Sequence, residues 1–292
     1  WQRSLLPGLR QCGLQVIQDH RNLTPEQAGY VDEYFMENVY PVLTPMAVDS
    51  SRPFPLIVNK TLNLCALLKK KNEEDAELEF ATVQVPAVLP RIVSIPGVEK
   101  DVHSVILLEE IISRNMQKLF LSYDILCVHP YRIMRNADLT IDEDEASDLL
   151  KEIEKQLKKR QWGEVIRLEI DEKVDKRLLK ILKKEFAVKE DGIYRIGGPL
   201  DLTFLMKMYG LDGFEEQKEP KYTPQPVPEL TGKNDIFEEI RKGDILMHHP
   251  YQTFDPVVDF IRQAARDQNV LAIKQTLYRV SGNSPIIAAL AQ

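Results

Sequence analysis

The sequence predicts an α+β protein with more than one domain, and three observations lead to this prediction. The chain has 292 residues, and single hydrophobic cores stop growing at about 250 to 300 residues, so at least two cores are expected. Helix-capping patterns alternate with apolar and β-branched runs, which indicates both kinds of secondary structure. A proline-rich segment over 214–230 separates two regions with different patterns.

The first 60 residues predict helices followed by a shaped loop. Residues 1–22 are expected to form helical pieces that proline and glycine interrupt. Thr24 is expected to cap a second helix to about residue 39, because Pro25 occupies its first turn and Gln27 completes a capping box. The prolines of 40–55 exclude regular helix and favour extended backbone.

The region up to residue 215 mixes strands and helices. Strands are expected at 62–68, 78–85, 125–132 and 164–170, the first two forming a hairpin, and helices at 140–160, 174–186 and 201–209. Gly210 is expected to end the last helix in a left-handed conformation. These elements predict one mixed α/β domain.

Beyond the proline-rich segment the pattern changes to alternating helices and strands. Helices are expected at 236–241, 256–266 and from 285, and strands at 244–248 and 270–280. A helix between two strands indicates a right-handed crossover, so the sequence predicts the opening βαβ unit of a parallel sheet.

Two helices of this region begin with a capping residue and a proline, Asp255-Pro256 and Ser284-Pro285. Both starts are expected beside the carboxyl ends of the predicted strands, where helix N-termini favour anions. An anionic, phosphate-bearing ligand therefore fits this edge.

Arg279 and Lys274 lie in the second of these strands. Alternation puts Arg279 and Lys274 on opposite faces, with Arg279 at the carboxyl end, and a guanidinium suits bidentate contact with phosphate. His248 and His249 end the preceding strand, where a phosphoryl acceptor or general base would be useful, but neighbouring strand residues face opposite ways. Spacing alone leaves open that all four are surface, packing or capping residues.

Composition narrows the function classes. A net charge of −7 argues against a general binder of nucleic acid, and no apolar run is long enough to span a membrane. The three cysteines indicate neither a disulfide framework nor a zinc site, so the cytoplasm is expected.

His20, His103 and His129 do not have the spacing of metal ligands and are expected to be structural or exposed. The basic runs at 69–71 and 155–160 read as solvated faces, with polyanion contact as the alternative.

Four segments, in order, carry a resemblance to a known family. They are Tyr40-Pro-Val-Leu-Thr-Pro45, Pro53-Phe-Pro-Leu-Ile-Val-Asn-Lys60, Asp244-Ile-Leu-Met-His-His-Pro-Tyr-Gln-Thr-Phe254 and Val270-Leu-Ala-Ile-Lys-Gln-Thr-Leu-Tyr-Arg279. Together they resemble the type-1 polyphosphate kinases. The resemblance implies the tail of a helical N-terminal domain at 1–34, a head domain at 35–222, and a linker with the start of a first, phospholipase-D-like catalytic domain at 223–292.

The resemblance also implies chemistry. The family transfers the terminal phosphate of ATP reversibly to inorganic polyphosphate through a phosphohistidine, with Mg²⁺, and its head domain helps to form a dimer. Arg279 matches an arginine at the ATP phosphates and Mg²⁺; Lys274, His248 and His249 are further candidates nearby. The phosphohistidine is expected beyond Gln292, so the chain is expected to be an inactive fragment. The parent protein is expected to be a cytoplasmic homo-oligomer (dimer or higher) that binds ATP, ADP and polyphosphate. Peripheral association of the parent with a membrane is left open.

Two other functions remain open on the sequence. The chain could serve as an oligomerisation module that binds a polyanion without chemistry. It could also belong to a phospholipase-D-like nuclease or lipase, which requires a His-x-Lys pair that 1–292 lacks.

Overall fold

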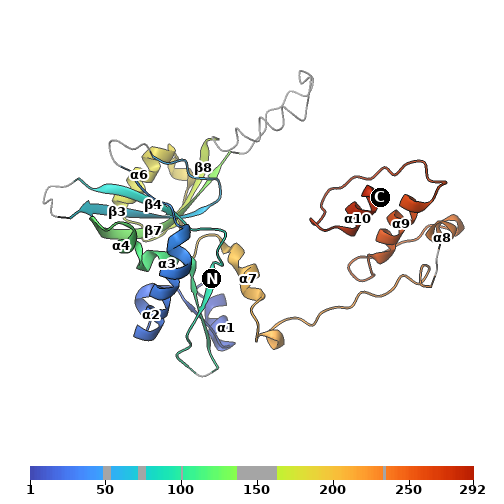
Figure 1. Ribbon diagram of the computed structural model, residues 1–292, viewed down its shortest axis with the longest axis horizontal. Helices are drawn as coiled ribbons and strands as arrows, with labels where there is room; N and C mark the ends of the chain where they lie inside the picture. The colour runs from blue at the N-terminus through green and yellow to red at the C-terminus, as the bar shows by residue number, and fades with distance from the viewer. Residues whose placement is uncertain (49–53, 72–76, 100, 137–162, 233–234) are drawn as a thin grey trace, which may run out of the picture. The chain divides into compact units, whose positions relative to one another are not determined.

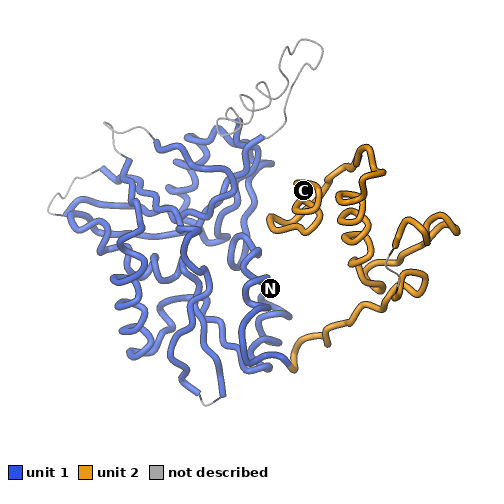
Figure 2. The backbone as a smooth tube through the Cα atoms, turned by 45° about the vertical axis from the view of Figure 1, so that its right-hand side comes forward, with its two compact units in different colours: residues 1–215 blue, residues 216–292 orange. Residues whose placement is uncertain are grey.

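The structure is a computed structural model that describes residues 1–48, 54–71, 77–99, 101–136, 163–232 and 235–292 (Figure 1). It divides into two compact units, 1–215 and 216–292 (Figure 2). The helix predicted at 140–160 and the basic run at 155–160 lie outside the described residues. The predicted α+β class is confirmed.

The N-terminal residues form two helices with a strand between them. Helix α1 (Leu5–Gln11) contains Pro7, which sits in the first turn, where its missing N–H needs no partner. The helical prediction for 1–22 is wrong at β1 (Leu14–Ile17), because this apolar run pairs with another strand and is buried. Helix α2 (Pro25–Tyr34) has the predicted capping box and continues through a π-helical turn, Phe35–Val39.

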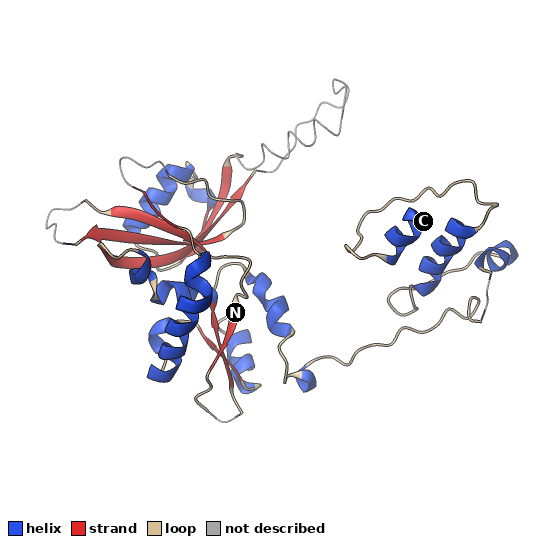
Figure 3. Cartoon of the chain, viewed as in Figure 1, coloured by secondary structure: helices blue, strands red, loops and turns tan. Residues whose placement is uncertain are grey.

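In the described part of the first unit, nine strands form two sheets (Figure 3). The smaller sheet has the order β1-β6-β5, with β5 at Ile92–Ile95 and β6 at His103–Leu107. The larger has the order β2-β4-β3-β7-β8-β9. Its strands are β2 (Pro45–Val48), β3 (Leu62–Lys70), β4 (Glu79–Gln84), β7 (Tyr123–Arg135), β8 (Val165–Asp171) and β9 (Ile193–Ile196). The four predicted strands and the β3–β4 hairpin are confirmed.

Helices cover both faces of the larger sheet (Figure 1). On one face α2, α3 (Leu108–Arg114) and α4 (Met116–Leu119) pack against Leu64, Ala66 and Leu68 of β3. On the other face α6 (Lys176–Phe186) packs against Cys65 and Leu67 of the same strand. Strand β3 is therefore buried on both sides, as its unbroken apolar run requires.

A third, smaller core joins α7 (Leu205–Tyr209) to the smaller sheet. Gly210 follows α7 with φ −83°, so the predicted left-handed ending is wrong. Its N–H instead closes a tight turn onto the carbonyl of Lys207 at 3.0 Å, which needs no positive φ. Short 3₁₀ turns lie at His20–Asn22, Tyr40–Val42, Glu190–Gly192, Leu202–Phe204 and Glu215–Gln217.

Over its described residues, 216–232 and 235–292, the second unit contains three helices, α8 (Ile236–Lys242), α9 (Asp255–Arg266) and α10 (Pro285–Ala291). All three were predicted. The strands predicted at 244–248 and 270–280 are wrong, because both segments are irregular and largely exposed, with Leu246 at 88% and Leu271 at 97% exposure. A helix satisfies its own backbone, whereas two parallel strands without further neighbours are marginal.

None of the helices in the described part of the chain has the length and apolar character that crossing a membrane would require.

Candidate functional site

The predicted phosphate site lies in the second unit, on a scaffold that begins with the junction of α8 and α9. Asp235 caps α8 by accepting hydrogen bonds from the N–H groups of Phe237 (2.9 Å) and Glu238 (3.2 Å). Gln263 of α9 donates to the same carboxylate (2.7 Å) and accepts from the N–H of Ile236 (2.9 Å). The Gln263 hydrogen bond holds the pKa of Asp235 below its usual value. This one glutamine joins the two helices.

The predicted helix starts are confirmed in one case and shifted in the other. Ser284 caps α10 and accepts a hydrogen bond from the N–H of Ile286, with Pro285 as the first helical residue. Asp255 is the first residue of α9 and not its cap. In the preceding turn, the Thr253 hydroxyl donates a hydrogen bond to the Asp255 carboxylate at 2.7 Å. Neither helix starts beside a strand, since the predicted strands are absent.

His248 and His249 lie in an exposed turn that Gln252 closes. The side-chain oxygen of Gln252 accepts a hydrogen bond from the backbone N–H of His248 (2.7 Å). The backbone carbonyl oxygen of Gln252 lies 3.0 Å from Nδ1 of His249. Each imidazole also contacts an aromatic ring at its edge: His248 that of Tyr251 and His249 that of Phe254. These contacts orient both imidazole rings, and they explain the positions of both histidines without a bound substrate.

The proline-rich segment holds this turn from outside. Gln225 donates its N–H to the carbonyl of Tyr251 (2.8 Å) and accepts from the N–H of Thr253 (2.9 Å). The hydroxyl of Tyr222 donates to the same Tyr251 carbonyl at 3.2 Å, and Val227 is 2% exposed. The segment was predicted to be an extended linker, but its second half is packed and hydrogen-bonded. Nothing in the residue types of 222–227 identifies these partners in advance.

Arg279 and Lys274 lie in the irregular segment between α9 and α10, and both are exposed. Over the described residues, no hydrogen bond or ion pair joins Arg279 to Lys274 or to either histidine, so the structure does not bring the four predicted residues together. The Arg279 guanidinium has no carboxylate partner among these residues and keeps its full capacity for an anion. It offers no oxygen, so Mg²⁺ would have to be held there by phosphate oxygens.

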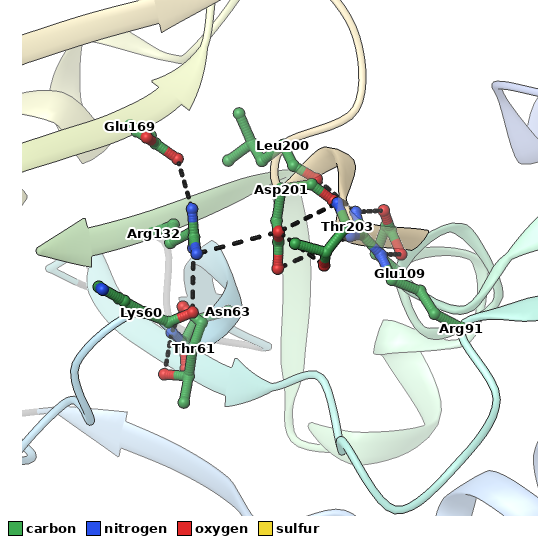
Figure 4. Close-up of polar contacts among 10 residues, drawn as sticks. All are labelled: Lys60, Thr61, Asn63, Arg91, Glu109, Arg132, Glu169, Leu200, Asp201 and Thr203. Atoms are coloured by element: carbon green, nitrogen blue, oxygen red, sulfur yellow. Dashed lines mark hydrogen bonds and ion pairs between the residues drawn. The ribbon is translucent and has the colours of Figure 1, made fainter. Parts of the chain in front are cut away.

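An ionic network around Arg91 and Arg132 lies in the first unit, and the sequence gives no sign of it (Figure 4). Arg91 makes a two-pronged contact with the buried carboxylate of Glu109, with its Nε at 3.1 Å and an Nη at 2.6 Å. The same guanidinium donates to the carbonyls of Leu200 and Asp201 and lies 4.9 Å from the centre of the Phe204 ring. Its Nε and both Nη atoms are hydrogen-bonded within the protein, so Arg91 is a structural arginine.

Arg132 forms the other side of this network, and Asp201 lies between the two arginines in Figure 4. Arg132 donates to the carbonyl of Lys60 (2.9 Å) and to the carboxylate of Glu169 (3.3 Å), and it lies 3.9 Å from the carboxylate of Asp201. Asp201 has φ +53° and caps the turn that follows. The network joins the larger sheet to the turn before α7, and both guanidinium groups lie against carboxylates of the protein.

Two of the isolated histidines form ion pairs with carboxylates that are distant in sequence. His129 lies 3.2 Å from Asp171; burial alone would lower the pKa of His129, but the hydrogen bonds and charges of Asp171 and Cys127 outweigh it and raise this pKa to about 9. His20 lies 2.9 Å from Glu110, and with Asp19 these three place potential metal ligands within 4.8 Å of one another. Arg21 occupies the Asp19 carboxylate and lowers its pKa to about 2. This group is therefore already compensated by cations.

Comparison with known proteins identifies the family. The profile described as polyphosphate kinase middle domain matches residues 26–208, well over half of the chain, and the profile described as polyphosphate kinase C-terminal domain 1 matches 235–292. The chain belongs to the polyphosphate kinase family. The family profiles thus cover most of the first unit and the three helices of the second.

Relatives within the polyphosphate kinase family extend over nearly all of this chain. It is 48% identical to a polyphosphate kinase of Bacillus cereus over 98% of the chain, and 48% identical to one of Halalkalibacterium halodurans over 99%. The crystal structure of polyphosphate kinase from Porphyromonas gingivalis is similar with a TM-score of 0.76 at 26% identity over 98% of the chain. The chain spans 41% of the length of each of these proteins.

Proposed function

We propose that this chain is the part of a polyphosphate kinase that provides Arg279 as a phosphate contact in the transfer of the terminal phosphate of ATP to inorganic polyphosphate. The observation that carries the proposal is the exposed guanidinium of Arg279, which has no ion-pair partner among the residues that the structure describes, in a segment that matches the C-terminal domain 1 of the family. The paired arginines of the first unit supply the contrast, because Arg91 and Arg132 already donate to the carboxylates of Glu109 and Glu169.

The chemistry asked of Arg279 is electrostatic. A phosphoryl group in transfer carries charge on its peripheral oxygens, and a planar guanidinium can donate two parallel hydrogen bonds to them. Mg²⁺ would enter with ATP, coordinated by phosphate oxygens, since the residues around Arg279 supply no carboxylate set. Lys274 adds a second cation in the same irregular segment. His248 and His249 are proposed only as neighbours of this site, because Gln252 and the aromatic rings already account for their positions.

The phosphorylated histidine of the family is proposed to lie beyond Gln292, so the activity belongs to the full-length protein. That protein is proposed to act in the cytoplasm as a homo-oligomer, with ATP, ADP and inorganic polyphosphate as its small-molecule partners. The domain boundaries proposed for it are 1–34, 35–222 and 223–292.

Phosphoryl transfer measured on Arg279 variants of the full-length protein tests this proposal. Arg279→Lys keeps the charge but loses the planar pair of hydrogen-bond donors, so it is expected to lower turnover by about tenfold. Arg279→Ala is expected to lower turnover by about 10² to 10³. Arg266→Lys is the matched control, because Arg266 is an exposed arginine of the same unit, at the end of α9. Normal turnover in both Arg279 variants, with lower melting temperatures, would make Arg279 a structural residue and reject the proposal.

A further inference from the structure

Helix α6 carries a concentration of positive charge that neither the fold nor the phosphate site uses. The whole chain has a net charge of −7, yet α6 has five basic side chains and one acidic one over Lys176–Phe186. Its inner face is apolar: Leu178, Leu182 and Phe186 are buried against the larger sheet. The basic side chains therefore lie on the outer side of a helix that the core holds in place.

Three of the lysines form a continuous stripe. Lys176, Lys180 and Lys184 are exposed and four residues apart, so they follow one another along one side of the helix at intervals of about 6 Å. The other basic residues of α6 are already paired. Arg177 bonds the capping carboxylate of Asp175 (2.8 Å to its Nη), and Lys183 bonds Glu190. Within the described ranges, none of the three stripe lysines has an ion-pair partner.

The stability of the helix does not explain the stripe. Like charges four residues apart on a helix repel one another. Lys176 is also the first residue of α6, where the helix dipole disfavours a cation. Lys184 alone benefits from its place in the last turn. A bound anion that runs along the stripe would remove both the repulsion and the unfavourable charge at the helix start.

We propose that the outer face of α6, with Lys176, Lys180 and Lys184, is a second binding surface for linear inorganic polyphosphate, separate from the transfer site around Arg279. Polyphosphate carries a negative charge at every internal phosphate, so a row of evenly spaced cations matches it over several units at once. Lysine suits this role better than arginine, because a flexible point charge does not select one phosphate geometry. Such a surface retains a chain by many weak contacts, without a fixed register.

This proposal rests on the proposed function, which makes polyphosphate the substrate. The two can nevertheless fail separately. Binding to α6 is measured directly on this chain and requires no turnover, whereas the role of Arg279 is measured as phosphoryl transfer in the full-length protein. Stripe-dependent binding without any transfer activity would reject the proposed function alone.

The test is the affinity of the chain for inorganic polyphosphate of one defined length, measured by calorimetry at several salt concentrations. The variant Lys176→Gln/Lys180→Gln/Lys184→Gln is expected to bind about tenfold more weakly, as three exposed charge contacts of ordinary strength imply. The slope of log affinity against log salt concentration should become shallower by about 2, since three phosphate contacts are lost. In the wild-type chain, polyphosphate should raise the melting temperature, and in the variant it should do so less.

A control variant with the same change in net charge separates the stripe from general electrostatics. Lys118→Gln/Lys207→Gln/Lys221→Gln removes three lysines that lie apart on α4, α7 and the proline-rich segment. Near wild-type affinity in this control, with loss in the α6 variant, supports the proposal. Equal losses in both variants would overturn it, because only net charge would matter. Tighter stripe-dependent binding to phosphatidylserine vesicles or to an RNA oligonucleotide than to polyphosphate would also overturn it, because the ligand class would be wrong.

Discussion

The ion pair of His129 and Asp171 should make the stability of the first unit depend on pH in the neutral and alkaline range. Against the effect of burial, Asp171 and, to a smaller extent, Cys127 raise the pKa of His129 from 6.5 to about 9 in the folded protein. The folded state then holds a proton that the unfolded state releases between these two values. The pair's contribution is therefore fully present below about pH 6.5 and is lost as the pH rises through about 9.

The size of the effect follows from the shift. A difference of about 2.5 pH units corresponds to at most about 3.4 kcal/mol, at about 1.36 kcal/mol per unit. Asp171 is 30% exposed at its side chain, so solvent screens part of this interaction. We expect the free energy of unfolding to fall by about 1 to 2 kcal/mol between pH 6.5 and 9. Urea unfolding of residues 1–292 at closely spaced pH values measures it.

Two variants isolate the pair. Asp171→Asn keeps an acceptor for the N–H of Lys173, which the Asp171 carboxylate binds at 2.9 Å, but removes the charge that holds the proton on His129. Its stability should be lower at pH 6.5 and nearly level above that value. His129→Gln should show the same flat profile. A wild-type slope in either variant would refute the assignment, since the titrating group would then lie elsewhere.

Three further results are expected. Glu109→Ala leaves the guanidinium of Arg91, 17% exposed at its side chain, without its carboxylate and should cost about 3 kcal/mol in urea unfolding, with a smaller loss for Glu109→Gln. Leu182→Ala opens a cavity between α6 and the sheet and should cost about 2 to 4 kcal/mol, whereas a loss below about 1 kcal/mol would mean that α6 is not packed as described. Limited proteolysis should cut the proline-rich segment first within 216–221, because the residues from Tyr222 onward are bonded to the turn at Tyr251; first cuts at 225–228 would contradict that contact.

Helices were predictable wherever their signals are local. The capping box of Thr24 and Gln27 and the serine cap at Ser284 depend on residues within four positions, and the structure contains both. Gly210 shows the limit of such reasoning, since a glycine after a helix is compatible with more than one turn. Strands β3, β4, β7 and β8 of the larger sheet were predicted because their apolar runs are long, whereas the four-residue strands β2 and β9 were missed.

The errors arise where a structure depends on distant residues. The segment Leu14–Ile17 was read as helix because its strand partner, β6, lies almost 90 residues later in the sequence. The segments 244–248 and 270–280 have strand-like patterns but no neighbouring strands to bond. The sequence likewise has no periodic pattern that indicates the ion pair of Arg91 with Glu109. It has none that indicates the hydrogen bonds of Gln252 with the two histidines. Arg279 was identified from a motif, and its contact with phosphate is a proposal.

Strand β3 gives the first unit a particular kind of cooperativity. Its alternate residues belong to two different cores, Leu64 to one and Leu67 to the other, on opposite faces of a single backbone. Neither core can come apart without exposing a strand that the other still requires. We therefore expect residues 1–215 to melt in one transition, with amide exchange at β3 slowed to the rate of global unfolding, although the sheet is covered by two separate groups of helices.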